Sequence, residues 1–98
     1  MSSVEYSSFA ASDNPTLFVR TFPGGKTIVG AKPALNEHDF KAIGPMNLDD
    51  RKPYVEHEEG MTVYNCRDRA LGGITVQALS GYIEQVTGFE PDIIGPRL

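Results

Sequence analysis

The chain has 98 residues, a formal net charge of −4 and 40% hydrophobic residues, which is typical of one small globular domain. The negative charge disfavours a phosphate backbone as a partner, so we expect no nucleic-acid function. One cysteine, Cys66, rules out an internal disulfide, the first residues lack a secretory signal, and no apolar run approaches the roughly 18 residues that cross a bilayer. We therefore expect a soluble, cytoplasmic protein with no membrane partner.

Serine is frequent in residues 1–14, and the apolar side chains there follow no regular period. We predict a flexible N-terminal arm over residues 1–14 and a single domain over residues 15–98. Tyr6 and Phe9 are large apolar residues of this arm. The segment is either a frayed terminus or an arm that orders against a neighbouring subunit, because such side chains are costly to leave in water.

Two apolar runs flank Pro23, Gly24 and Gly25, and this pattern predicts a β-hairpin with a three-residue turn. Val19 and Val29 are opposite each other in this register. The face that contains this pair carries Leu17, Val19, Val29 and Ala31. The opposite face carries Phe18, Phe22 and Ile28. Because both faces are apolar, the hairpin is either covered on both sides or has one face that awaits a partner.

A short helix is predicted over residues 36–43, with Asn36 as its N-cap and Gly44 just beyond its end. Phe40 and Ile43 supply its apolar stripe. Turn-forming residues are frequent over the following residues, 45–53, which predicts a surface connection to the next strand.

A second hairpin is predicted around residues 58–60, Glu-Glu-Gly, again with a three-residue turn. This register pairs Val55 with Val63 on one face and Tyr54 with Tyr64 on the other. A turn of only two residues would set a glutamate opposite Val63 and mix polar and apolar side chains on each face, which a pleated strand disfavours.

The second half of the chain predicts one long helix. Residues 67–73 are expected to form a loop and residues 74–87 the helix, because Leu79, Ile83 and Val86 recur at helical spacing. Gly88 is the expected C-terminal stop of that helix.

Residues 92–94 lie between two prolines and predict one short last strand. The elements then run in the order ββαββαβ, an α+β fold with an antiparallel or mixed sheet of about five strands, one principal helix and one short helix. Many unrelated folds share this order, so it predicts no activity. The residues expected to form the core are Leu17, Val19, Val29, Phe40, Val55, Val63, Val76, Leu79, Ile83, Val86 and Ile94.

The segment before the predicted long helix contains a candidate site for an anionic small molecule. Arg67 and Arg69 are followed by the pair Gly72-Gly73. Free N–H groups at a helix start attract anions, glycines allow close approach, and arginines bind phosphate or carboxylate through two parallel hydrogen bonds. The alternative interpretation is a solvated loop in which Asp68 pairs with an arginine.

Other chemistry-bearing patterns are incomplete. Residues 25–27, Gly-Lys-Thr, match the end of a phosphate loop but lie at a hairpin turn and lack the required earlier glycine. His38, His57 and Cys66 do not have the spacing of a zinc site. The predicted hairpin also places His57 and Cys66 on opposite faces, where they cannot exchange a proton. We therefore predict no catalytic residue, no metal, no cofactor and no enzyme activity.

We predict a small non-catalytic interaction protein, either an assembly or structural component or an inhibitor or regulator of a larger protein. It would act through an apolar sheet face, a strand edge and the N-terminal arm. Its partner would be another protein or a second copy of the chain, and we expect a homo-oligomer. The alternatives are a binding or sequestering module for an anionic small molecule and an accessory subunit of an enzyme. The predicted partner-binding residues are Phe18, Phe22, Ile28, Tyr6 and Phe9.

Overall fold

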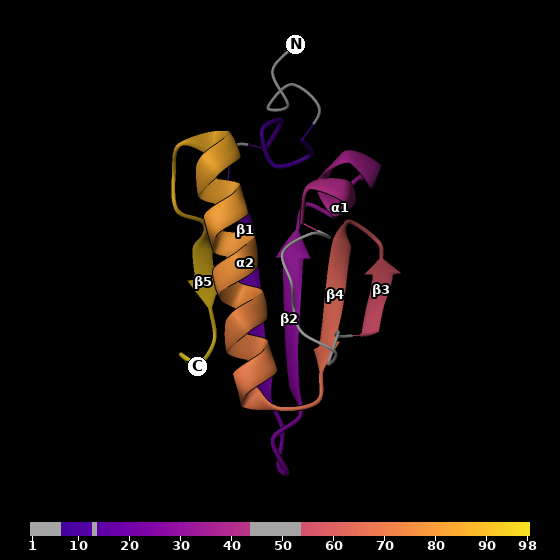
Figure 1. Cartoon of the computed structure of the whole chain (residues 1–98), viewed down its shortest axis with the longest axis vertical. Helices are drawn as coiled ribbons and strands as arrows, with labels where there is room; N and C mark the ends of the chain where they lie inside the picture. The colour runs from indigo at the N-terminus through magenta and orange to yellow at the C-terminus, as the bar shows by residue number, and fades with distance from the viewer. Residues whose placement is uncertain (1–6, 13, 44–53) are drawn as a thin grey trace.

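The structure is a computed structural model of the chain, and it describes residues 7–12, 14–43 and 54–98. Its elements follow the predicted order (Figure 1). They are β1 (Thr16–Thr21), β2 (Thr27–Lys32), α1 (Glu37–Ile43), β3 (Tyr54–Glu58), β4 (Met61–Cys66), α2 (Arg69–Thr87) and β5 (Asp92–Ile94). One mixed five-stranded sheet with two helices confirms the predicted α+β fold.

The strands lie in the order β3-β4-β2-β1-β5. Neighbouring strands are antiparallel except at one end of the sheet, where β5 runs parallel to β1. A parallel strand needs a crossover connection. The helix α2, which follows β4 and precedes β5 in the chain, provides this connection by passing along the sheet (Figure 1). The last strand therefore returns beside the first.

The two helices pack on one face of the sheet, because α1 and α2 contact each other and enclose the same cluster of buried side chains. We call this the covered face. Its sheet residues are Leu17, Val19, Thr27, Val29, Ala31, Thr62, Tyr64 and Cys66. Side chains alternate along a strand, so the opposite or second face carries the residues between them. These are chiefly Phe18, Arg20, Ile28, Gly30, Lys32, Met61, Val63 and Asn65.

The predicted register of the first hairpin is confirmed. Val19 pairs with Val29, and the Phe22 N–H donates to the Lys26 carbonyl at 2.8 Å to close a three-residue turn. The two turn glycines have φ angles of 91° and 98°. Glycine adopts such left-handed values without a steric cost, which explains why this sequence turns here.

The predicted register of the second hairpin is wrong. The β3–β4 turn contains two residues, 59–60, so that Val55 pairs with Tyr64 and Glu56 with Val63. β3 is an edge strand whose residues are exposed except for Val55, which is half-buried against the core. A polar edge strand specifies register weakly by its own alternation. The shorter turn is the one that brings Val55 to the covered face.

α2 begins at Arg69 rather than at residue 74, so the predicted loop over residues 67–73 is wrong from Arg69 onward. Asp68 is the N-cap, and its carboxylate accepts a hydrogen bond from the Leu71 N–H at 2.8 Å. Gly72 lies in the first turns of the helix, where a Cβ atom would be 2.7 Å from the Thr27 Cγ2. Glycine is a poor helix former, but here it lets the helix approach β2 closely. Packing thus outweighs propensity.

The described part of the predicted arm packs on the domain. Phe9 is 0% exposed, and its ring meets Tyr82 edge-on at a centroid distance of 6.1 Å. The Ser8 N–H and hydroxyl donate to one Asp39 carboxylate oxygen at 3.1 and 2.6 Å. Phe9 is therefore a core residue and is not available to a partner, contrary to prediction. Tyr6 lies outside the described residues.

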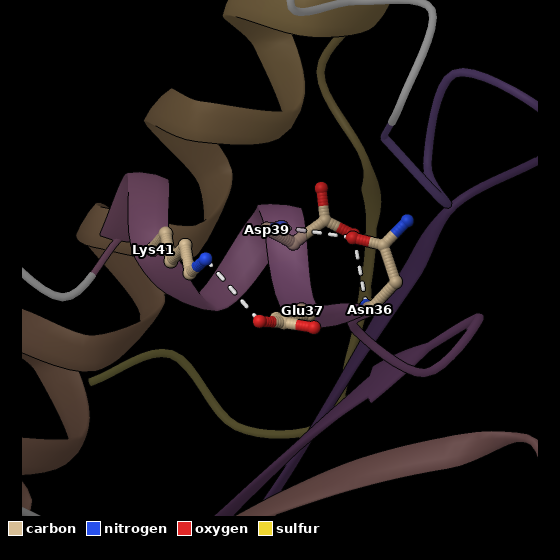
Figure 2. A network of polar contacts seen from close by, with 4 residues as sticks. All are labelled: Asn36, Glu37, Asp39 and Lys41. Carbon is tan, nitrogen blue, oxygen red and sulfur yellow. Dashed lines mark hydrogen bonds and ion pairs between the residues drawn. The ribbon is translucent and has the colours of Figure 1, made fainter.

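A buried carboxylate, Asp39, joins three segments of the chain. Its N–H donates to the Asn36 side chain at 2.8 Å, and the Asn36 N–H donates back to the carboxylate at 3.1 Å (Figure 2). This reciprocal cap confirms Asn36 as the N-cap of α1. The Tyr82 hydroxyl of α2 donates to the other carboxylate oxygen at 2.5 Å. Together with Ser8, these bonds tie α1 to α2 and to the N-terminal segment.

The predicted core is largely confirmed. Its buried members are Leu17, Val19, Val29, Val63, Leu79, Ile83 and Val86, of which Val63 lies on the second face. Phe40, Val55 and Val76 are half-buried against the core. Ile94 is wrong: it is 54% exposed, because β5 is a three-residue edge strand whose alternation turns this residue to the second face. Core residues that the predicted set missed are Phe9, Ala31, Leu35, Ile43, Tyr64, Cys66, Leu71 and Tyr82.

Candidate interaction surface

The second face has an apolar centre built from β1, β2 and β4. Phe18 lies opposite Gly30, which in turn lies opposite Val63. A Cβ atom at Gly30 would be 2.6 Å from the Met61 Sδ and 3.8 Å from the Phe18 Cβ. The flexible methionine side chain therefore covers the bare backbone of Gly30. Together with Ile28, these side chains form what we call the apolar strip: Phe18, Ile28, Met61 and Val63.

The strip continues toward the β1–β2 turn. Phe22, just beyond β1, is 38% exposed, and the Arg20 guanidinium lies 5.6 Å from the centre of its ring. This distance allows a cation–π contact. Three of the predicted partner-binding residues, Phe18, Phe22 and Ile28, thus lie on the same face, in the arrangement that the first hairpin implied.

Among the described residues, no helix packs on the apolar strip, because α1 and α2 both belong to the covered face. Phe18, Ile28 and Met61 are half-buried by their neighbours, whereas Val63 is buried. An antiparallel sheet that has one face covered normally presents polar side chains on its other face. A strip of large apolar side chains in this position is typical of a surface that binds something.

Charged side chains border the strip with opposite signs on its two sides. Arg20 and Lys32 are exposed on β1 and β2, and Glu56 and Glu58 are exposed on β3. All four belong to the second face by their pairing. A protein that covered the strip would therefore meet cations toward β1 and carboxylates toward β3.

The predicted anion-binding residues do not surround an open helix start. The Asp68 carboxylate accepts the Leu71 N–H and so takes the position in which an anion would bind. Gly72-Gly73 lie within α2, where the first glycine is buried and the second half-buried. Arg67 and Arg69 are exposed on either side of Asp68. Gly72 serves helix packing, and the geometry gives no support to an anion site.

Cys66 and His57 also lie far apart. Burial raises the pKa of the Cys66 thiol, while its hydrogen bond with Thr75 acts in the opposite direction. His57 is on the same face as Cys66, not the opposite one as predicted, but at the other end of the hairpin. There its Nδ1 lies 3.4 Å from the Thr62 hydroxyl, and its ring lies 5.1 Å from that of Phe40. Within the described ranges, no three metal-ligating side chains form a group.

A second apolar region, which the predictions missed, lies where β5 meets α2. A groove of about 500 Å³ is lined there by Val19, Val76, Ile93 and Leu98 among others. Ile93 is 47% exposed. The sequence holds one signal for this exposure: two adjacent isoleucines in a strand point to opposite faces, so they cannot both enter one core.

Comparison with known proteins adds no family to this description. No family model, no curated protein and no solved structure matches the chain. None of the helices in the described part of the chain has both the length and the hydropathy of a membrane span. Function is therefore inferred from the surfaces themselves.

Proposed function

We propose that this chain is a small non-catalytic interaction protein that binds a partner protein through the second face of its sheet. This role includes an assembly component, a regulator of a larger protein and an accessory subunit of an enzyme. The observation that carries the proposal is the apolar strip, on which no helix packs within the described residues.

The energetics of the strip support this role. Apolar area removed from water contributes about 25 cal/mol per Å². Phe18 and Ile28 keep part of that area exposed, and Phe22 adds more at the end of the strip. Polar residues are usual at strand positions on an uncovered sheet face, so the apolar ones favour a partner that covers them.

The charges around the strip indicate the chemistry of that partner. Its centre would be apolar, and acidic side chains would lie where it meets Arg20 and Lys32. We expect the surface to meet such a partner in a reducing compartment such as the cytoplasm. Cys66 supports this expectation as a free thiol within the core.

A paired substitution on the second face tests the proposal. Phe22→Ser with Ile28→Thr removes apolar area while keeping residues that a hairpin tolerates. Full-length wild type and variant are immobilised side by side, and proteins captured from a cell extract are quantified by mass spectrometry. We expect the specific partner to fall by about tenfold or more with the variant, because apolar anchors dominate interface energies.

The matched control is a double substitution on the exposed side of α1, Glu37→Gln with Lys41→Gln. Both side chains are largely exposed and lie away from the second face. Capture by the control variant should equal that of wild type, and thermal unfolding should show both variants folded. Equal capture by the Phe22→Ser, Ile28→Thr variant and by wild type would show the proposal to be wrong.

A further inference from the structure

The outer edge of β5 has backbone groups without a strand partner among the described residues, since β5 ends the sheet. The Asp92 N–H donates to the Pro15 carbonyl at 3.2 Å, so the backbone groups of Asp92 point toward β1. Successive residues in a strand point these groups to opposite edges. The N–H and carbonyl of Ile93 therefore point outward, where another strand can pair with them.

Apolar side chains flank this edge on both faces. Ile93 is on the side of α2, opposite Leu17, and Ile94 is on the second face, opposite Phe18. Both are about half exposed, and Leu98 is 44% exposed beside the same groove. A strand added here would bury apolar area above and below the sheet at once.

The charges along β5 are self-complementary. Glu90 precedes the strand, Asp92 begins it and Arg97 follows it. All three residues are exposed. If two copies of β5 run antiparallel, the acidic end of each lies beside the basic end of the other. The other edge of the sheet cannot do this, because β3 carries Glu56 and Glu58, which would repel a second copy.

We propose that two copies of this chain pair antiparallel through β5 about a two-fold axis, so that the sheet continues from one copy into the other. Such an interface is isologous, since the same edge serves both partners. Few backbone hydrogen bonds are available to a three-residue strand, so the isoleucines supply the contact and the charges supply the orientation. The proposal extends the interaction role to a different surface, and either one can fail without the other.

The first test is the effect of one edge residue on self-association. Sedimentation velocity of the full chain over a concentration series should show a monomer–dimer equilibrium, and Ile93→Lys should weaken it by about tenfold or more. Ile74→Lys is the matched control, because Ile74 of α2 is 39% exposed but does not line the groove beside β5. It should dimerise like wild type.

The second test reads the antiparallel arrangement from charge reversal at low salt. One variant carries Arg97→Glu, and the other carries Glu90→Lys with Asp92→Lys. Each alone places like charges together and should dimerise about tenfold or more less tightly than wild type, whereas an equal mixture should form heterodimers. Since exposed charges are screened by ions, added salt should reduce this difference.

Three results would overturn the proposal: a wild type that stays monomeric throughout, a dimer that survives Ile93→Lys, or a mixture no more associated than its components. A dimer lost with Phe22→Ser, Ile28→Thr but kept with Ile93→Lys would place self-association on the second face instead. Loss of partner capture without loss of the dimer separates this proposal from the function proposed above.

Discussion

The two faces of the sheet carry similar residues but do different work. On the covered face, Leu17, Val29 and Ala31 are fully enclosed by the helices. On the second face, Phe18 and Ile28 are just as apolar and only half-buried. Apolar character alone therefore does not identify the core. Burial by the helices decides which residues stabilise the fold and which remain available to a partner.

The largest expected difference in stability is between substitutions of two isoleucines, one on each side of the sheet. Ile83→Ala in α2 should lower the free energy of unfolding by about 3–4 kcal/mol, because Ile83 is fully buried and its removal leaves a cavity. Ile28→Ala on the second face should cost less than about 1 kcal/mol, since this site opens to water. Urea unfolding of both variants measures the two values. Equal losses would mean that the second face is part of the core.

The next test concerns Asp39, the buried carboxylate of α1. Asp39→Asn should lower the free energy of unfolding by about 2 kcal/mol, because the amide cannot accept every hydrogen bond that the carboxylate accepts. Burial and the bond to Asp39 raise the pKa of Tyr82 to about 12, so the tyrosine remains a donor. Urea unfolding at neutral pH measures the loss.

The same carboxylate predicts a pH dependence. Burial alone would raise the pKa of Asp39, but hydrogen bonds from Ser8, Tyr82 and Ser7 and from the Asn36 backbone outweigh it and hold the pKa below 3.8. Since the folded pKa is lower than the unfolded one, the stabilisation is complete above about pH 5 and is lost as pH falls through the folded value. As pH falls from about 5 through the folded pKa of Asp39, wild type should lose more stability than the Asp39→Asn variant loses. A constant difference between them would contradict this assignment.

The first hairpin was predictable because two local signals agree. The glycine turn sets the register, and the alternation of Leu17 and Val19 against Val29 supports it. The apolar second face followed from the same alternation. The second hairpin lacked this agreement, because Val55 is the only apolar residue of β3 that packs against the core. Its register depends on contacts of Val55 and His57 with distant parts of the chain.

Long-range contacts account for the other errors. Nothing near Phe9 in the sequence predicts burial, which follows from the bonds of Ser8 to Asp39, far along the chain. The early start of α2 depends on Gly72 packing on β2, a tertiary contact that helix propensity does not contain. The candidate surface at β5 was missed for the same reason, since its exposure depends on which strand lies beside β1.

Substituting one glycine on each face by alanine tests how tightly that face is packed. Gly72→Ala on the covered side should cost about 1–3 kcal/mol, because the added Cβ would lie 2.7 Å from a methyl group of Thr27 within the packed core. Gly30→Ala should stay within about 0.5 kcal/mol of wild type, because its neighbour is the flexible end of Met61, which can swing into water. Thermal unfolding measures both. A large loss at Gly30 would indicate that the strip is tightly packed and closed to a partner.

The smallest effect is expected within α1, which shows the same contrast across one short helix. Lys41 and Glu37 form an ion pair at 3.2 Å on the side away from the core, and their side chains are 76% and 84% exposed (Figure 2). Lys41→Gln keeps the helix propensity and removes the charge, so it should cost about 0.3 kcal/mol or less. This loss should disappear in high salt, while that of Asp39→Asn should persist, because only the exposed pair is screened.

Asp39 and Lys41 are two residues apart, and both are charged, but only Asp39 is enclosed by the covered side of the fold. If urea unfolding gave them equal losses, the presence of a charge would matter more than its burial. A much larger loss for Asp39→Asn than for Lys41→Gln would instead show that enclosure by the helices makes a residue important for stability, in α1 as in the sheet. The half-buried residues of the apolar strip, Phe18 and Ile28, lie outside that enclosure, which is why they can be changed at little cost to the fold and tested for binding.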